Sequence, residues 1–126
     1  MKIKSIDHIV LTVADLNKTI EFYTQIMGFK AVTFDDNRKA LIFGNQKINL
    51  HQKGHEFEPK AKQPTCGSAD LCFIAQTDIH DVLEELKQKN IEIIEGIVDR
   101  TGALGKIRSV YFRDPDQNLI EVSNYH

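Results

Sequence analysis

The sequence predicts an α+β fold made of two successive β-α-β-β-β modules in a single domain. Two observations lead to this prediction. Apolar residues alternate with polar ones in short runs, and the same order of elements occurs twice, in residues 1–52 and 69–126. A polar segment, residues 53–68, holds two of the three prolines and reads as a linker. Two halves that give the same order independently support an internal duplication, and 126 residues suit one domain.

The first module follows from alternation and turn residues. Residues 5–13 alternate as a half-buried strand does. Asp15 is a favourable N-cap for a helix over residues 16–28, and Gly28 suits the left-handed position that ends it. Three strands over 29–35, 38–44 and 46–52 follow, separated by turn residues at 35–37 and 44–45.

The second module repeats the first. Residues 69–75 form a predicted strand, Asp78 caps a helix over 79–89, and Asn90 takes the place of Gly28 as the residue that ends the helix. Strands over 91–98, 106–114 and 118–124 complete the module. Residues 100–106, RTGALGK, lie between two of these strands and fit either a mobile lid or a plain connecting loop.

Composition excludes several classes of function. Hydrophobic residues make up 41% of the chain, charged residues 27%, and the net charge is -2. Scattered charges of this kind predict no nucleic acid partner and no membrane partner. The N-terminus lacks the apolar core of a signal peptide, so we expect a cytoplasmic protein. The two cysteines form no CxxC motif, and Cys72 is expected to be a small buried residue.

Polar residues of the ligand type stand on one face of the predicted strands. Side chains alternate between faces with a period of two. His8 therefore shares a face with Thr12, Asn49 shares one with His51, and the opposite faces are aliphatic. In the second module Asp70 and Glu121 hold similar places. A carboxylate inside an apolar strand costs several kcal/mol unless it is paired, hydrogen-bonded or metal-bound. Pairing of Glu121 with Lys47 or Lys106 is the simplest alternative to a metal site.

Two motifs carry a resemblance to a known family. The segment IDHIVLTVADLNKTIEFYTQIMGF near the start and VYFRDPDQNLIEV near the end, with the repeat between them, resemble the vicinal oxygen chelate superfamily. This superfamily includes glyoxalase I, bleomycin-binding proteins and extradiol dioxygenases. The chain looks like a small bacterial glyoxalase-like branch often labelled as virulence proteins. The resemblance implies a curved, incompletely closed mixed sheet around a cavity.

The same resemblance implies a metal site. His8 matches the ligand position of the first strand, and Glu121 matches that of the last strand. Asp70 stands where family enzymes commonly carry His, and Asn49 stands where glyoxalase I carries Glu. His51 is a further candidate, either as a ligand or as a base. Nitrogen and oxygen ligands suit Zn²⁺, Ni²⁺, Co²⁺, Mn²⁺ or Fe²⁺ without choosing among them.

Arg38 and Arg108 fall at corresponding points of the two halves, where they could bind an anionic group of a substrate together with Thr12 and Asn49. Exposed arginines of edge strands are the alternative.

The resemblance implies a metal-dependent lyase or isomerase for a small α-oxoaldehyde or its thiol adduct, with Glu121 or His51 moving the proton. The alternatives are an extradiol-type dioxygenase, which would use His8, His51 and Glu121, and a metal-free protein that binds a drug or metabolite. Relatives pair their modules within or between chains, so we expect a homodimer.

Overall fold

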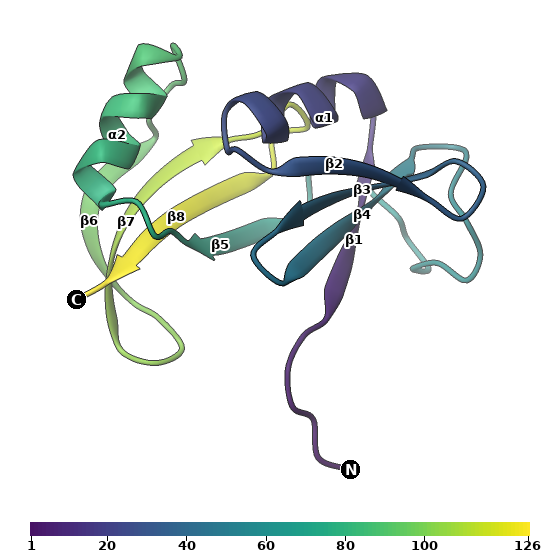
Figure 1. Cartoon of the computed structure of the whole chain (residues 1–126), viewed down its shortest axis with the longest axis horizontal. Coiled ribbons are helices and arrows are strands. Elements are labelled where there is room, and N and C mark those ends of the chain that lie inside the picture. The colour runs from purple at the N-terminus through teal and green to yellow at the C-terminus, as the bar shows by residue number, and fades with distance from the viewer. The chain divides into compact units, whose positions relative to one another are not determined.

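A computed structural model describes all 126 residues of the chain (Figure 1). The chain divides into two compact units, Met1–Cys66 and Gly67–His126, which we call the N-terminal and C-terminal units. Each unit holds one four-stranded mixed sheet and one helix, in the order β-α-β-β-β. The predicted α+β class and the repeat of the module are therefore confirmed. Neither helix has the length and apolar character needed to cross a membrane.

The N-terminal unit contains β1 (His8–Val13), α1 (Leu16–Gln25), β2 (Lys30–Phe34), β3 (Arg38–Phe43) and β4 (Gln46–Gln52). Its strand order is β1-β4-β3-β2, with β1 parallel to β4 and the other pairs antiparallel. The side chain of Asp15 accepts a hydrogen bond from the backbone N–H of Lys18 at 3.1 Å, which is the predicted N-cap. Gly28 has a φ of 71°, as the left-handed position requires.

The core of the N-terminal unit lies on the face of the sheet that α1 covers. Leu11 and Val13 of β1 are buried there, next to Ile48 and Leu50 of β4. From the helix, Tyr23 is fully buried, and its ring lies 5.6 Å from that of Phe29 by their centroids. The alternation seen in the sequence thus separates an apolar face from a polar one.

The C-terminal unit contains β5 (Asp70–Ile74), α2 (Ile79–Gln88), β6 (Glu95–Thr101), β7 (Lys106–Arg113) and β8 (Leu119–Tyr125). Its strand order, β5-β8-β7-β6, repeats that of the first unit, again with a parallel pair, β5 and β8. Asn90 has the expected positive φ, 59°. The buried residues Val110, Phe112, Ile120 and Val122 form the centre of its core, together with Ile79 and Leu86 of α2.

The sixth strand begins four residues later than predicted, and it ends at Thr101 instead of residue 98. After the helix the backbone N–H of Ile91 donates to the carbonyl of Leu86, so the chain is still completing the helix end where a strand was expected. Residues 100–106 join β6 to β7, and the lid alternative for them stays a prediction. Arg100 and Thr101 belong to β6, and Gly102 donates to the carbonyl of Gly105 in a tight turn at 2.7 Å.

The loop between β7 and β8 is held by the side chains of Asp114 and Asn118. One carboxylate oxygen of Asp114 accepts hydrogen bonds from the backbone N–H groups of Asp116 and Asn118, and the other accepts from the amide of Asn118. The carbonyl oxygen of that amide accepts from the backbone N–H of Ala69 at 2.8 Å. The loop is therefore tied to the start of β5, and both residues are buried.

Candidate functional site

The polar face of the N-terminal sheet is built by the parallel pairing of β1 and β4. His8 lies opposite Lys47, Val10 opposite Asn49, and Thr12 opposite His51. Paired residues of neighbouring strands point to the same face. The structure thus brings Thr12, Asn49 and His51 together on one face, with His8 on the same face at the start of β1.

The polar face of the C-terminal sheet has the same register. Asp70 lies opposite Leu119, and Cys72 lies opposite Glu121. Asp70 therefore corresponds to His8, and Glu121 corresponds to Asn49. In each unit the two positions are diagonal neighbours, about 8 Å apart by strand rise and strand spacing. This is close enough for Asp70 and Glu121 to share one ligand.

Glu121 is half-buried and is stabilised by hydroxyl groups. Its Oε2 accepts a hydrogen bond from the hydroxyl of Ser109 at 2.5 Å and a longer one from Ser123 at 3.4 Å. The two serines are fully buried and hydrogen-bonded to each other at 2.7 Å. No lysine pairs with the carboxylate, so the alternative of an ion pair with Lys47 or Lys106 is not what the structure shows.

Tyr111 and Arg100 extend this network. Tyr111 pairs with Glu121 across β7 and β8. Burial first, and then the nearby Glu121 carboxylate, raise the pKa of Tyr111, so the phenol stays protonated beside it. The guanidinium carbon of Arg100 lies 5.4 Å from the centre of the Tyr111 ring. Oε2 of Glu121 is thus held in place by donors from β7 and β8.

Two buried polar atoms of β4 have no hydrogen-bond partner. Nε2 of His51 and Oδ1 of Asn49 are both inaccessible to solvent, and the residues are 3% and 6% exposed. Leaving a buried polar group unsatisfied costs about 1–3 kcal/mol. Burial first, and then the Arg38 guanidinium, lower the pKa of His51, so its imidazole is neutral near pH 7.

His8 and His51 occupy opposite ends of the same face. His8 is exposed, and its Nδ1 lies 2.7 Å from the carboxylate of Asp7. His51 stands four positions further along the pairing, which is about 13 Å by strand rise. Zn–N bonds are about 2.0–2.1 Å long, so two imidazoles that rise from the sheet at these positions do not reach one ion.

Arg38 and Arg108 do not correspond to each other, which is a correction to the sequence analysis. Arg38 shares the face of Ala40, which pairs with Asn49. Arg108 pairs with Asn124 and so lies on the face of β7 opposite to Ser109 and Glu121. Its Nε lies 3.8 Å from the carboxylate of Asp99. The turns before β3 and β7 differ in length, and counting residues through them gave the wrong equivalence.

Cys72 is exposed, and the prediction that it is buried was wrong. It lies on the polar face of β5, and its Sγ is 3.3 Å from the hydroxyl of Ser123. Sequence reasoning also missed Ser109, Tyr111 and Phe57. The first two follow from the register of β7 against β8. The signal that could have pointed to them is that Ser109 and Tyr111 are two residues apart and share one face of the predicted strand.

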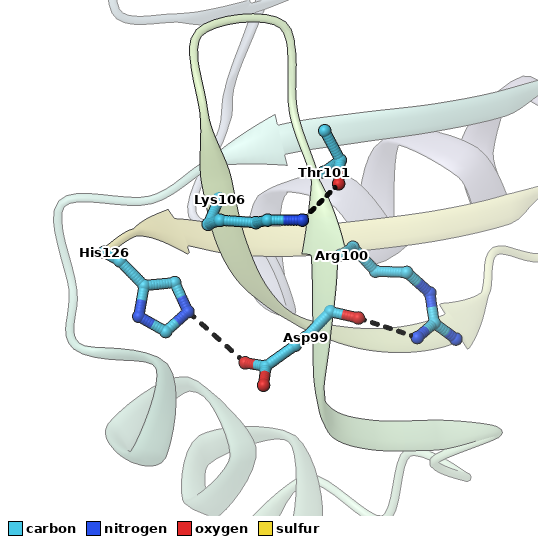
Figure 2. A pocket seen from close by; sticks show the side chains of 5 residues that line it. All are labelled: Asp99, Arg100, Thr101, Lys106 and His126. Carbon is cyan, nitrogen blue, oxygen red and sulfur yellow. Dashed lines mark hydrogen bonds and ion pairs between the residues drawn. The ribbon is translucent and has the colours of Figure 1, made fainter.

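A hollow of about 510 Å³ lies where β6 ends and β7 begins, next to the C-terminal residue His126 (Figure 2). Its lining residues are Asp99, Arg100, Thr101, Lys106 and His126. Figure 2 shows that these side chains are paired with one another: His126 lies 3.3 Å from Asp99, and Lys106 donates to Thr101 at 3.1 Å. All five residues are exposed, and none was predicted as a site residue.

No group of three or more His, Cys, Asp and Glu side chains in the structure is arranged to hold a metal ion. His8 and His51 belong to the N-terminal unit, whereas Asp70 and Glu121 belong to the C-terminal unit. The predicted ligand set stays a prediction.

The sequence matches the family model described as Glyoxalase/Bleomycin resistance protein/Dioxygenase superfamily over residues 5–122. The chain belongs to this superfamily. The virulence protein STM3117 of Salmonella typhimurium is 64% identical over 99% of this chain and 87% of its own length. The glyoxalase domain-containing protein RDO1 of Mycosarcoma maydis is 54% identical over 99% of this chain and 70% of its own length.

The chain is also similar to a metallothiol transferase and to solved structures. The metallothiol transferase FosB of Staphylococcus saprophyticus is 27% identical over 95% of this chain and 76% of its own length. The crystal structure of STM3117 matches with a TM-score of 0.99, 63% identity and full coverage of both chains. Lactoylglutathione lyase from Agrobacterium tumefaciens gives a TM-score of 0.76 at 20% identity, covering 98% of this chain and 96% of its own, and shows the fold alone.

Proposed function

We propose that the chain is a metal-dependent, glyoxalase-like lyase that acts on a small α-oxoaldehyde or its thiol adduct. The observation that carries this proposal is the carboxylate of Glu121. It stands half-buried in a strand, has no basic partner, and is held at one oxygen by Ser109. Membership of the superfamily supports it, as does the name of the relative FosB, a metallothiol transferase.

The residues proposed as ligands of divalent ions are His8 in the N-terminal unit and Asp70 with Glu121 in the C-terminal unit. Their nitrogen and oxygen donors fit Zn²⁺, Ni²⁺, Co²⁺, Mn²⁺ or Fe²⁺. The diagonal placement of Asp70 and Glu121 on one face fits a cation too, because two carboxylates at this spacing repel each other unless a positive charge lies between them. We leave His51 out of this set because it stands about 13 Å along the strands from His8.

A divalent ion held there would supply Lewis-acid polarisation of two neighbouring substrate oxygens. Glu121 is the proposed base as well as a ligand. Its Oε1 would have to leave the ion to take the proton, because Oε2 is engaged by Ser109. Ser109 and Ser123 keep the carboxylate oriented.

The test begins with metal content. Protein purified without added metal should carry about one divalent ion per site, and His8→Ala and Glu121→Gln should each lower metal affinity about tenfold or more. His80→Ala and Glu84→Gln, which change exposed residues of α2, are matched controls. The metal-replete chain is then assayed with methylglyoxal, with and without a thiol. Wild-type affinity in both ligand variants would contradict the site.

The dioxygenase alternative is tested in the same series with catechol, Fe²⁺ and oxygen. It needs two histidines and one carboxylate on one ion. His8 and His51 are four positions apart along the pairing of β1 and β4, which is too far for both to bind one ion. Cleavage of catechol without turnover of methylglyoxal would nevertheless favour the dioxygenase function over the lyase function.

A metal-free binding protein is the second candidate function, and one observation favours it. At the position equivalent to Glu121, the N-terminal sheet carries Asn49, which cannot be ionised and has an unsatisfied buried oxygen. The antibiotic binding protein TnmS3 from Streptomyces shares the fold, with a TM-score of 0.78 at 18% identity and 100% and 99% coverage. Tight binding of a small molecule by protein that takes up no metal would support this reading.

A further inference from the structure

The polar face of the N-terminal sheet holds an arginine without an acidic partner. The guanidinium carbon of Arg38 lies 4.7 Å from the centre of the Phe57 ring and 5.3 Å from that of Phe34. Its side chain forms no ion pair, and the acidic residues of the adjacent turn, Asp35 and Asp36, form none with it either. Aromatic contacts occupy the faces of a guanidinium and leave its N–H donors, which lie in the plane, for a ligand.

The surrounding charges are also unbalanced. Nζ of Lys47 lies 4.1 Å from the centre of the Phe34 ring and has no carboxylate partner. Glu56 is the acidic residue that acts on His51, but it is engaged by Lys60 at 3.0 Å and by the backbone N–H of Gly54. Arg38 and Lys47 therefore contribute two positive charges that no anion of this unit neutralises.

The unsatisfied atoms of β4 lie beside this positive charge. Nε2 of His51 and Oδ1 of Asn49 are buried and without a partner. The His51 ring lies 5.5 Å from that of Phe57, which also contacts Arg38. Buried polar groups in native proteins nearly always have a partner, and exceptions point to a missing ligand or water. Oδ1 of Asn49 only accepts hydrogen bonds, so it fits an N–H or O–H group of a ligand, whereas Nε2 of a neutral imidazole donates or accepts according to its tautomer.

We propose that Arg38, Asn49 and His51 form a binding site for the oxyanion group, carboxylate or phosphate, of a small organic molecule. The fork of a guanidinium matches both groups in a bidentate manner. His51 and Asn49 bind the polar atoms next to that group, and Lys47 adds long-range attraction. The site consists of residues of the N-terminal unit alone and needs no metal, so it stands independently of the proposed lyase activity.

Phe57 covers this site. It belongs to residues 53–68, which contain no helix or strand, and 39% of its surface is exposed. Its ring contacts both His51 and Arg38. A ligand that reaches Nε2 of His51 displaces this ring, so Phe57→Ala should speed association without abolishing binding.

The experiment measures anion binding by the full chain after its metals are removed with a chelator. Pyruvate and inorganic phosphate are titrated at constant ionic strength, with sodium chloride as the reference salt. Calorimetry gives the affinity, and NMR follows the ring signals of His51. The wild type should bind at least one of the two anions saturably and shift the His51 signals. The anion that binds more tightly identifies carboxylate or phosphate as the natural group.

Two variants test the residues and one serves as the control. Arg38→Gln should weaken binding about tenfold or more, since it removes a charge-assisted bidentate contact. His51→Phe should weaken binding while its thermal midpoint stays at or above that of the wild type, because it removes an unsatisfied buried group. Arg108→Gln changes an arginine of the other unit and should bind like the wild type.

Three outcomes overturn the proposal. These are no saturable binding of either anion by the wild type, unchanged affinity in Arg38→Gln, or an equal loss in Arg108→Gln. If Arg38→Gln does not fold, Arg38→Lys takes its place; it keeps the charge but loses the planar fork, so it should still bind more weakly. Because no metal is present, these results are separate from those of the metal-binding experiment.

Discussion

The carboxylate of Glu121 has two apolar neighbours on β8, and hydroxyl groups stabilise it there. Ser109 is fully buried and donates to Oε2 at 2.5 Å, and Ser123 bonds to Ser109 in turn. A charged acceptor with short hydrogen bonds is better stabilised than a neutral one. Since these donors hold one oxygen and are themselves held by each other, the direction of the carboxylate is fixed before any ligand arrives.

Replacing Ser109 tests this arrangement. Ser109→Ala removes a buried hydrogen bond to a charged group, so we expect it to lower the free energy of unfolding by about 1.5–3 kcal/mol. Urea unfolding of the wild type and the variant measures the difference. Ser5→Ala, at an exposed position outside the sheet, should change little. An unfolding free energy within about 0.5 kcal/mol of the wild type would show that Ser109 does not stabilise Glu121.

His51 should make stability depend on pH. Burial and Arg38 lower its pKa in the folded chain below the ordinary value of 6.5. When the pH falls below that value, the unfolded chain takes up a proton that the folded chain does not, so the free energy of unfolding decreases. Above pH 6.5 His51 is neutral in both the folded and the unfolded chain, so its contribution to the free energy of unfolding is constant. The loss ends once the pH falls below the lowered pKa.

The measurement compares unfolding of the wild type and of His51→Asn between about pH 5 and pH 8. The other histidines are present in both proteins, so their titration cancels in the difference. We expect the wild type to lose stability relative to the variant as the pH falls below about 6.5. A difference that stays constant over this range would contradict a lowered pKa.

At the scale of single residues, the sequence predicts which face of a strand a side chain occupies better than it predicts which residue of the next strand that side chain contacts. Alternation with a period of two placed Asn49 and His51 on one face, and Asp70 and Glu121 on another, because the pleat enforces it. It could not reveal that Ser109 approaches Glu121, because that contact depends on the register of β7 against β8. The same dependence on register made Arg108 an incorrect counterpart of Arg38.

Among the elements, the loop from Asp114 to Asn118 shows a motif whose main role is structural. Part of the family resemblance rested on RDPDQN, yet both polar side chains at the ends of this loop are buried and satisfied within it. Gln117 adopts a positive φ of 70° in the turn between them. Gly67 is also fitted to this loop, since a Cβ added there would lie 2.6 Å from the carbonyl oxygen of Asp116.

Asn118→Ala should therefore destabilise the C-terminal unit. It removes the bond to the Asp114 carboxylate, which keeps its two backbone donors, and the bond that anchors Ala69 at the start of β5. We expect a loss of about 2–4 kcal/mol in the free energy of unfolding, from two buried hydrogen bonds of which one is charge-assisted. Thermal and urea unfolding measure it, with Glu84→Gln as the surface control. A loss below about 1 kcal/mol would refute this account of the loop.

The strand β6 is the element that the sequence places least well. Residues 91–94 are rich in β-branched residues, and that composition predicted a strand there. Asn90 and Ile91 instead complete the end of α2. The register then shifts between Gly96 and Val98. Propensity is a local signal, whereas the start of β6 is set by pairing with β7, so the boundary was not predictable from residues 91–98 alone.

For the whole molecule, the repeat was evident from the sequence because each half gives the same order of elements. Each sheet also has open edges: β1 and β2 in one unit, and β5 and β6 in the other. Val10 on β1 and Ile74 on β5 are 46% and 53% exposed. Edge strands with exposed apolar residues are places where a second chain can add.

We therefore expect a homodimer in solution. Light scattering coupled to size exclusion should give twice the mass of the 14.4 kDa chain at micromolar concentrations. Val10→Lys and Ile74→Lys should each shift the protein toward the monomer, because a charge then replaces apolar surface at an interface. Thr33→Lys, which adds a lysine on the other edge strand, is the control. A monomeric mass for the wild type at every concentration would reject the dimer.

The parallel pairing of β1 with β4, and of β5 with β8, has a consequence for the order of assembly. The strands β2, β3 and β4 are joined by short turns, whereas β1 reaches β4 only after α1, β2 and β3 have been passed along the chain. Contacts between residues that are distant in the sequence form late. Closing the long loop between them costs conformational entropy, and the new contacts offset that cost only once they have formed. In kinetic measurements of folding, Leu41→Ala in β3 should slow folding, whereas Val13→Ala in β1 should mainly speed unfolding. His8 and Asp70, carried by β1 and β5, would then reach their places in the last steps of folding.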